Sequence, residues 1–75
     1  MNGFKESLCY FMRIRGVKQK DVAARLHCER QTVSNYMRGV SEPDIDTLIR
    51  LAWILGVDVN ELTGFFYLKK GEKKA

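Results

Sequence analysis

Residues 29–39, ERQTVSNYMRG, carry side chains suited to hydrogen bonding rather than to catalysis. If the segment is a helix, about 100° of rotation per residue places Gln31, Asn35 and Arg38 on the side opposite Val33. Gln and Asn present paired donors and acceptors that match the edge of adenine, and Arg matches guanine. A helix that needs only solubility more often carries Glu and Lys. The pattern therefore favours recognition of base edges, with a plain solvated face as the alternative.

Catalytic and metal-binding patterns are weak in this sequence. It contains no pairing of a nucleophile with a base, no glycine-rich phosphate loop and no pair of carboxylates suited to one cleft. His27 and Cys28 are adjacent, but the chain has a single histidine and no CxxC motif. Cys9 lies among apolar residues, where a free thiol usually behaves as a small hydrophobic group. We therefore expect a protein that is not an enzyme and that needs no metal or cofactor.

The charges of the chain are unevenly distributed. Residues 1–38 carry eight Lys or Arg against three acidic residues, whereas residues 39–64 carry one Arg against five acidic residues. Residues 65–75 add four lysines and one glutamate, so that the whole chain has a net charge of +4. A basic surface attracts polyanions by neutralising phosphates and releasing counterions. The charge of the first half is consistent with nucleic acid as a partner, although a solvated surface without a partner would have the same composition.

Length and composition indicate one small globular domain. Seventy-five residues suffice for a single modest core, and 45% hydrophobic with 29% charged residues is typical of a folded rather than a disordered chain. No apolar run approaches the roughly 20 residues of a membrane span. The N-terminal segment lacks the basic start and the unbroken apolar stretch of a signal peptide. The expected location is the cytoplasm, with no membrane partner.

Apolar residues recur at helical spacing and predict five short helices. The first four apolar stripes are Phe4, Leu8, Phe11 and Met12; Val22, Ala23 and Leu26; Val33, Tyr36 and Met37; and Ile45, Leu48, Ile49, Ala52 and Leu55. Residues 58–62, DVNEL, predict the fifth helix. No alternation typical of a strand extends over more than a few residues, so the predicted fold class is all-α.

The predicted helices have recognisable ends. Glycines follow three of the apolar stripes and are expected to terminate those helices: Gly16, Gly39 and Gly56. Asp44, directly after Pro43, is expected to cap the fourth helix. Asp58 and Glu61 have the spacing of a capping box for the fifth helix. Tight turns are therefore expected between the helices.

The stretch QKDVAARLHCERQTVSNYMRG, residues 19–39, resembles the Cro/C1-type (XRE) helix-turn-helix family, and the resemblance extends over about residues 5–64. The matching positions are Gly16, Gln19, Ala23, Leu26, Thr32, Val33, Ser34, Arg38, Gly39, Pro43, Leu48, Ala52, Leu55, Gly56, Val57, Glu61 and Leu62. The resemblance implies a compact five-helix, lambda-repressor-like DNA-binding domain over residues 1–64, followed by an aromatic and then Lys-rich tail over residues 65–75. It also implies that the third helix, residues 30–38, enters the major groove.

The resemblance assigns roles to individual positions. The residues that match base-contacting positions are Arg30, Gln31, Ser34 and Asn35. Those expected to contact phosphates are Lys18, Gln19, Lys20, Thr32 and Arg38. Gln19 matches the position whose side chain and backbone N–H hold a phosphate at a helix N-terminus. Val33 and Tyr36 match core positions and are expected to be buried.

Several residues depart from the pattern of the family. Lys18 replaces the usual Thr or Ser cap of the second helix, so a weaker cap is expected there. Glu29 replaces the usual cap of the third helix, and its carboxylate would repel DNA phosphates. His27 stands where glycine is usual, which implies a left-handed backbone at a residue that adopts it at a cost. Met12 and Met37 stand where many members of the family have an Arg and a Glu that form a buried ion pair. Replacing both charged residues is tolerated, whereas replacing only one would leave a buried charge without a partner.

The last part of the chain suggests self-association. Trp53 matches a position that is usually polar and exposed, and the segment FFYL adds four apolar residues, Phe65, Phe66, Tyr67 and Leu68. These five residues are the expected dimerisation surface; alternatively, the FFYL segment folds back over Trp53. We expect a sequence-specific regulator of transcription, a repressor, that binds double-stranded DNA as a homodimer. The alternative is an antitoxin-like module that binds a toxin and regulates its own promoter.

Overall fold

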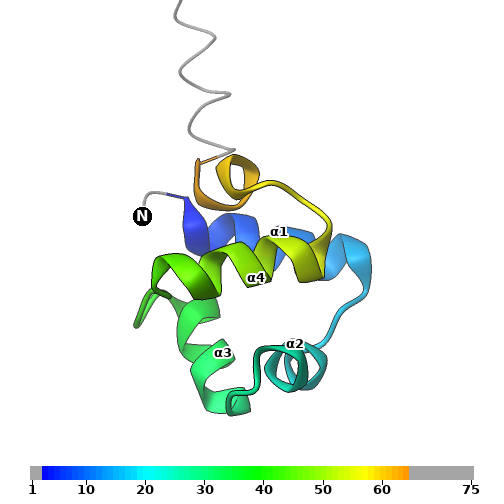
Figure 1. Cartoon of the computed structure of the whole chain (residues 1–75), viewed down its shortest axis with the longest axis vertical. Coiled ribbons are helices and arrows are strands. Elements are labelled where there is room, and N and C mark those ends of the chain that lie inside the picture. Colours follow the sequence, from blue (N-terminus) through cyan, green and yellow to red (C-terminus); the bar gives the residue numbers. More distant parts are fainter. Residues whose placement is uncertain (1–2, 65–75) are drawn as a thin grey trace, which may run out of the picture.

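The computed structural model describes residues 3–64 of the chain. This part contains five helices: α1 (Phe4–Arg15), α2 (Gln19–Leu26), α3 (Arg30–Arg38), α4 (Ile45–Leu55) and a last helix over residues 59–64. In Figure 1, α2 and α3 lie on one side of α1 and α4, and the helix over 59–64 lies on the other side. The prediction of an all-α domain of five helices is confirmed. The predicted tail, residues 65–75, lies outside the described residues.

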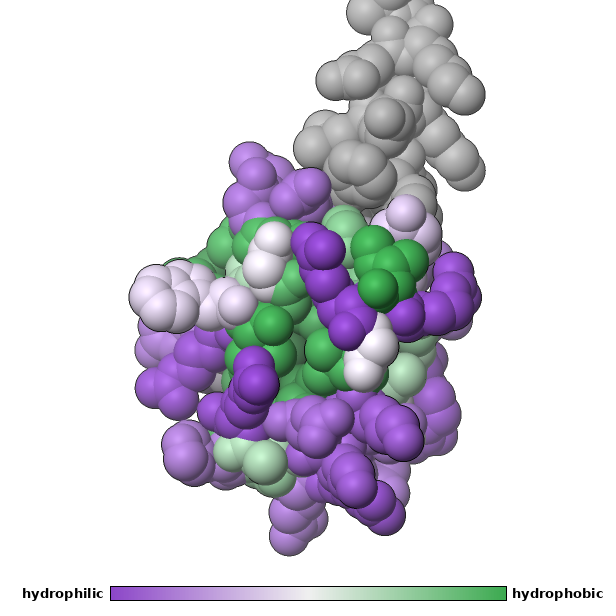
Figure 2. Space-filling model, turned by 90° about the vertical axis from the view of Figure 1, so that its right-hand side faces the viewer, coloured by the Kyte–Doolittle hydropathy of each residue, from purple (hydrophilic) through white to green (hydrophobic). Residues whose placement is uncertain are grey.

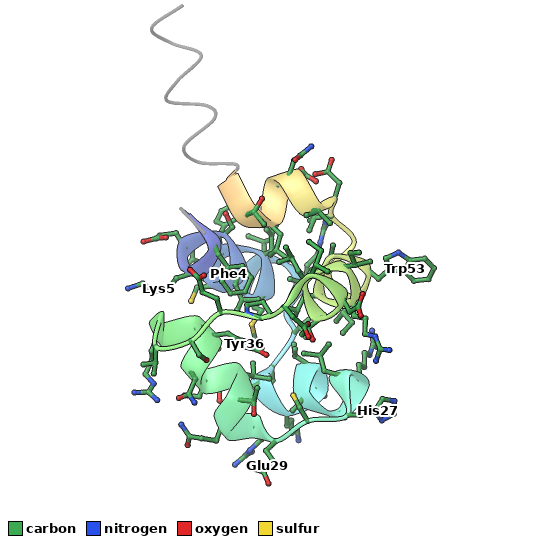
Figure 3. All side chains as sticks on the ribbon, turned by 60° about the vertical axis from the view of Figure 1, so that its left-hand side comes forward. Phe4, Lys5, His27, Glu29, Tyr36 and Trp53 are labelled. Atoms are coloured by element: carbon green, nitrogen blue, oxygen red, sulfur yellow. The ribbon has the colours of Figure 1, made fainter. Side chains whose placement is uncertain are left out.

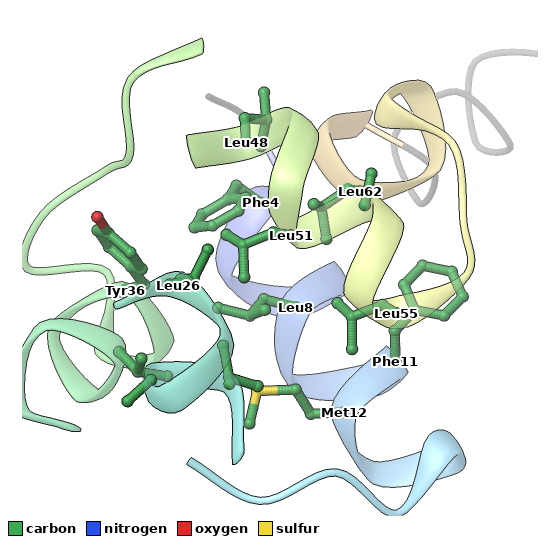
Figure 4. Packing of buried hydrophobic residues seen from close by; sticks show 14 residues of the cluster. Phe4, Leu8, Phe11, Met12, Leu26, Tyr36, Leu48, Leu51, Leu55 and Leu62 are labelled. Carbon is green, nitrogen blue, oxygen red and sulfur yellow. The ribbon is translucent and has the colours of Figure 1, made fainter. Parts of the chain in front are cut away.

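The core takes at least one side chain from every helix. Leu8, Val22, Val33, Leu51 and Leu62 come from the five helices in order, and all are 0% exposed. They form one cluster with larger side chains from α1 and α3 (Figure 4). The rings of Phe4 and Tyr36 meet edge to face with centroids 6.2 Å apart, which joins α1 to α3. This cluster fixes the position of α3 relative to the rest of the domain.

The predicted core face of α4 is partly wrong. Ile45 and Ile49 were expected in the core, but they are 64% and 44% exposed, whereas Leu51 is completely buried. The residues of α4 that face the core are Leu48, Leu51, Ala52 and Leu55. The reason is that α4 is apolar on most of its circumference, so two overlapping stripes have helical spacing. Packing against α1 and α2 selects between them.

The predicted helix ends are confirmed. Gly16, Gly39 and Gly56 all follow a helix with positive φ. At Gly39 an added Cβ would lie 3.0 Å from Cδ of Lys5, a tight contact that would require the lysine side chain to shift. His27 has a φ of 58°, the left-handed conformation expected where the family has glycine. The left-handed backbone of His27 thus produces a sharp turn between α2 and α3.

Side-chain caps begin the last two helices as predicted. Asp44 Oδ1 accepts a hydrogen bond from the N–H of Thr47 at 2.9 Å. Asp58 and Glu61 form a reciprocal capping box, in which each carboxylate accepts from the N–H of the other residue, at 2.8 and 3.0 Å. Local hydrogen bonds therefore set where these helices start, independently of the core.

The Asp44 cap is expected to make the stability of the domain depend on pH in the acidic range. Hydrogen bonds with Thr47, first through its side chain and then through its backbone, lower the pKa of Asp44 below the ordinary value of 3.8. A carboxylate with a lowered folded pKa stabilises the fold above its unfolded pKa, and this contribution is lost as the pH falls through the lower folded pKa. Asp44→Ala should therefore have a lower Tm than the parent at pH 7, and the difference should shrink below about pH 3.8. Thermal melts at pH 7 and pH 3 check this, with Glu29→Ala as the control because the exposed Glu29 carboxylate makes no cap hydrogen bond; an equal Tm difference at both pH values would contradict it.

Candidate nucleic-acid interface

The first candidate phosphate contacts surround the N-terminus of α2. Lys18, Gln19 and Lys20 are all exposed there. Lys18 is the N-cap residue, and its N–H donates to the carboxylate of Asp21 at 3.3 Å, whereas a lysine side chain has no acceptor with which to cap the helix in return. No hydrogen bond within the described residues takes the N–H groups of Gln19 and Lys20, and Lys18 and Lys20 bring two positive charges to this helix end. This arrangement suits an anion such as a phosphate.

The turn between α2 and α3 sets the orientation of α3 relative to α2. The N–H groups of His27 and Cys28 donate to the carbonyl oxygens of Ala24 and Ala23 at 3.3 and 3.0 Å and close α2. Glu29 then adopts an extended backbone, and its side chain makes no cap hydrogen bond to α3. Figure 3 shows Glu29 projecting from the N-terminal end of α3, away from the core. Its carboxylate is thus exposed at the end of the helix that carries the candidate base contacts.

The two sides of α3 differ sharply in chemistry. Val33 and Tyr36 are buried, as expected, and Met37 is half-buried against the same core. Arg30, Gln31 and Arg38 are exposed, and the remaining candidates are half-buried: Thr32, Ser34 and Asn35. All six polar candidates on α3 therefore remain at least partly accessible. Since α3 packs on α1 and α2 through its apolar side, its polar side faces away from the domain.

Three of the candidates form a hydrogen-bonded cluster, which we call the α3 cluster. Gln31 Nε2 donates to Asn35 Oδ1 at 3.0 Å, and Arg38 Nη2 donates to the same oxygen at 2.6 Å. The spacing of four and three residues along the helix makes these contacts possible. Arg30, Thr32 and Ser34 lie on the same helix, but no hydrogen bond joins them to this cluster. The structure thus brings together the three residues that the sequence places on the side opposite Val33: Gln31, Asn35 and Arg38.

Two basic residues of the first half make contacts within the domain. Arg15 Nε donates to the carbonyl oxygen of Leu55 at 2.8 Å, and its Nη2 donates to that of Gly56 at 3.4 Å. This guanidinium therefore caps the C-terminus of α4. The guanidinium of Arg13 lies 5.8 Å from the ring centroid of Tyr10. Sequence reasoning missed the role of Arg15, because its partners lie forty residues or more away in the chain.

The thiols of the domain lie in settings that do not favour reactivity. Burial raises the pKa of Cys9, and Cys9 Sγ donates to the carbonyl oxygen of Met37 at 3.5 Å. Burial and then the carboxylate of Glu29 raise the pKa of Cys28. A thiol needs its thiolate form to bind a metal or to act as a nucleophile. Among residues 3–64, no three His, Cys, Asp or Glu side chains gather in a way that could hold a metal ion.

The expected association residue on α4 is prominent. Trp53 is 85% exposed and forms an outer stripe with Ile45 and Ile49 along α4. Beside it lies a shallow hollow of about 270 Å³, lined by Arg25, Ile49, Arg50, Trp53 and Ile54. Figure 2 shows apolar atoms among polar ones on one face of the domain, so its surface is not uniformly hydrophilic. The other four association candidates, Phe65, Phe66, Tyr67 and Leu68, lie outside the described residues.

The outer stripe of α4 points away from the polar side of α3. Both helices pack against α1 and α2, and within residues 3–64 they do not pack against each other. Figure 3 shows Trp53 on the side of the domain opposite the ribbon of α3. The two candidate surfaces are therefore separate. None of the helices in the described part of the chain combines the length and the apolar character needed to cross a membrane.

Comparison with known proteins places this arrangement in a family. The family model described as "Helix-turn-helix" matches residues 12–62. The HTH-type transcriptional regulator ImmR of Bacillus subtilis (strain 168) is 37% identical over 49 residues, which is 65% of this chain and 39% of that protein. The crystal structure of a transcriptional regulator from Listeria innocua superposes with a TM-score of 0.76 and 38% identity, covering 81% of this chain and 57% of that one.

Both relatives are longer than the part that matches. This chain spans 39% of ImmR and 57% of the Listeria protein, so the comparison concerns the helix-turn-helix portion of each. Both are named as regulators of transcription, and neither name mentions a toxin. The chain belongs to the helix-turn-helix family of the Cro/C1 (XRE) type, with the lambda-repressor-like fold that its sequence led us to expect.

Proposed function

We propose that this chain is a sequence-specific regulator of transcription that binds double-stranded DNA, with α3 in the major groove. The observation that carries the proposal is the polar outer side of α3, which is anchored to the core by the buried Val33 and Tyr36. An α-helix fits the major groove of B-DNA, where each base pair presents a distinct pattern of donors and acceptors. The names of the two relatives, both regulators, support the same function.

The proposed contacts divide into positioning and reading. Phosphates are held by the N-terminus of α2 and by two residues of α3: Lys18, Gln19, Lys20, Thr32 and Arg38. Base edges are read by Arg30, Gln31, Ser34 and Asn35. Phosphate contacts set the register of a protein on the duplex and base contacts set its sequence preference. The exposed carboxylate of Glu29 opposes phosphate binding and lowers the affinity for DNA of any sequence.

We propose further that the regulator is a repressor that works by occupying its site. A domain bound in the major groove of a promoter excludes other proteins from the same base pairs. One short helix makes few base contacts, and relatives of this family gain affinity by pairing. A homodimer is accordingly part of the proposal.

The outer stripe of α4 is the described surface that fits a second copy of this chain. Asp46 and Arg50 are exposed and one helical turn apart beside the stripe. In an antiparallel pair of α4 helices, Asp46 of each copy lies opposite Arg50 of the other, so the surface is complementary to itself. Trp53 supplies the large aromatic contact typical of such interfaces. Because α4 lies apart from α3, pairing leaves both recognition helices open to DNA.

The pairing proposal predicts that Trp53→Ala weakens self-association. Removing a Trp that packs in an interface often costs more than the 1.4 kcal/mol that corresponds to a tenfold change, so the dimer dissociation constant should rise at least about tenfold. Sedimentation without DNA measures this, with Ile14→Ala as the control because Ile14 is exposed on α1. If the parent protein sediments as a monomer at tens of micromolar, pairing through α4 is wrong.

Selection of bound sites from random duplex DNA tests the proposed function. The full chain should enrich one short sequence. Gln31→Ala should then cost roughly 1–3 kcal/mol at that sequence and relax the preference at the base it contacts. Gln19→Ala should weaken binding to the selected and to random duplexes by the same factor, since a phosphate contact carries no sequence information. Failure to enrich any sequence, or equal loss on both duplexes for Gln31→Ala, would contradict the role of α3.

A further inference from the structure

The geometry of the α3 cluster determines which way the amide of Asn35 is turned. Arg38 carries only donors, so the Asn35 atom 2.6 Å from its Nη2 must be the oxygen Oδ1. Gln31 contacts the same oxygen at 3.0 Å and must do so through its own donor, Nε2. Each amide orientation follows from the guanidinium alone. A flipped Asn35 would put two donors face to face.

The two hydrogen bonds use up the acceptor of Asn35. A carbonyl oxygen has two lone pairs, and Gln31 and Arg38 take both. The bond from Arg38 is charge-assisted, which makes it the stronger of the two. Asn35 is then left with the N–H groups of Nδ2 to offer to DNA. Gln31 keeps its Oε1 acceptor together with one N–H.

Because only the donor group of Asn35 remains available, the base edges that Asn35 can recognise change. An Asn with both amide atoms free pairs with adenine, accepting from N6 and donating to N7. An Asn that only donates suits a base edge that only accepts, and in the major groove guanine presents two acceptors, N7 and O6. Gln31, with an acceptor and a donor still available, retains the pattern that matches adenine.

We propose that Arg38 is a positioning residue that holds Asn35 as a donor, so that Asn35 selects guanine rather than adenine while Gln31 selects adenine. The inference rests on the proposed function of α3, and it gives Arg38 a role in sequence preference beyond a phosphate contact. Arg38 holds Asn35 at Oδ1, and Asn35 contacts the base through the N–H groups of Nδ2. Loss of the guanidinium would free Oδ1 on one side and restore the adenine pattern to Asn35.

The experiment compares sites selected from random duplex DNA by four versions of the full chain. Asn35→Ala identifies the base pair at which Asn35 acts, because preference is lost there. At that position the parent should prefer guanine, and Arg38→Met should shift the ratio of adenine to guanine at least about tenfold toward adenine, within the range of one base contact. Arg30→Met is the matched control, since it removes the same charge from α3 outside the α3 cluster. It should leave the ratio at this position unchanged.

A second variant keeps the test independent of Arg38. Asn35→Asp retains the acceptor for Gln31 and Arg38 but has no N–H to donate, so it should lose guanine at that position and gain cytosine, whose N4 donates. Thermal melts establish that each variant is folded. The inference is overturned if the parent prefers adenine there, or if Arg38→Met lowers the affinity without changing the ratio of adenine to guanine at that position. A parent that selects no sequence at all would overturn the proposed function and the inference with it, whereas the former results leave the function standing.

Discussion

Met12→Arg is expected to destabilise the domain by about 3–5 kcal/mol, the usual effect of a buried charge without a partner. Met12 is 4% exposed and belongs to the core cluster (Figure 4). A guanidinium at this site would lose its hydration without gaining a carboxylate. Urea unfolding measures the change in the free energy of unfolding. Ile14→Arg is the control, because Ile14 lies on the same helix and is 50% exposed, and its change should stay within about 0.5 kcal/mol.

A partner for the new charge should restore stability. Met37 is half-buried against the core, and its carbonyl oxygen accepts from Cys9 on α1, one turn from Met12. The double variant Met12→Arg with Met37→Glu should therefore recover much of the loss, because the new carboxylate would pair with the new guanidinium. Equal stability of Met12→Arg and the parent would show that Met12 is not part of the core. A double variant as unstable as the single one would show that residues 12 and 37 do not meet.

Leu51→Ala is expected to cost about 2–5 kcal/mol, whereas Ile49→Ala should cost less than about 1 kcal/mol. Leu51 lies on the core side of α4 and is completely buried, so its truncation leaves a cavity. Ile49 is 44% exposed, so its side chain loses little contact when shortened. Urea unfolding of the two variants compares them directly. The apolar stripe predicted from the sequence suggests the opposite order, because that stripe includes Ile49 and not Leu51. A greater loss for Ile49→Ala would mean that α4 is rotated relative to the structure described above.

The local features of this protein follow from its sequence because short-range interactions produce them. The starts of α4 and of the helix over 59–64 depend on carboxylates three residues from the N–H groups that they accept. The ends of α1, α3 and α4 depend on glycines that adopt positive φ without a steric penalty. The polar and apolar sides of α3 follow from the helical period, since its apolar residues form a single narrow stripe. Each of these signals lies within one or two turns of the chain.

Other features depend on partners that are distant in the sequence. The buried side of α4 was decided by contact with α1 and α2, because the helix offers two apolar stripes and its own sequence does not rank them. The cap that Arg15 provides for α4 joins residues forty positions apart. Even on α3, the sequence placed Gln31, Asn35 and Arg38 outward but could not give the orientation of the Asn35 amide. That orientation depends on which rotamers bring two donors to one oxygen, and only the folded arrangement of the side chains decides it.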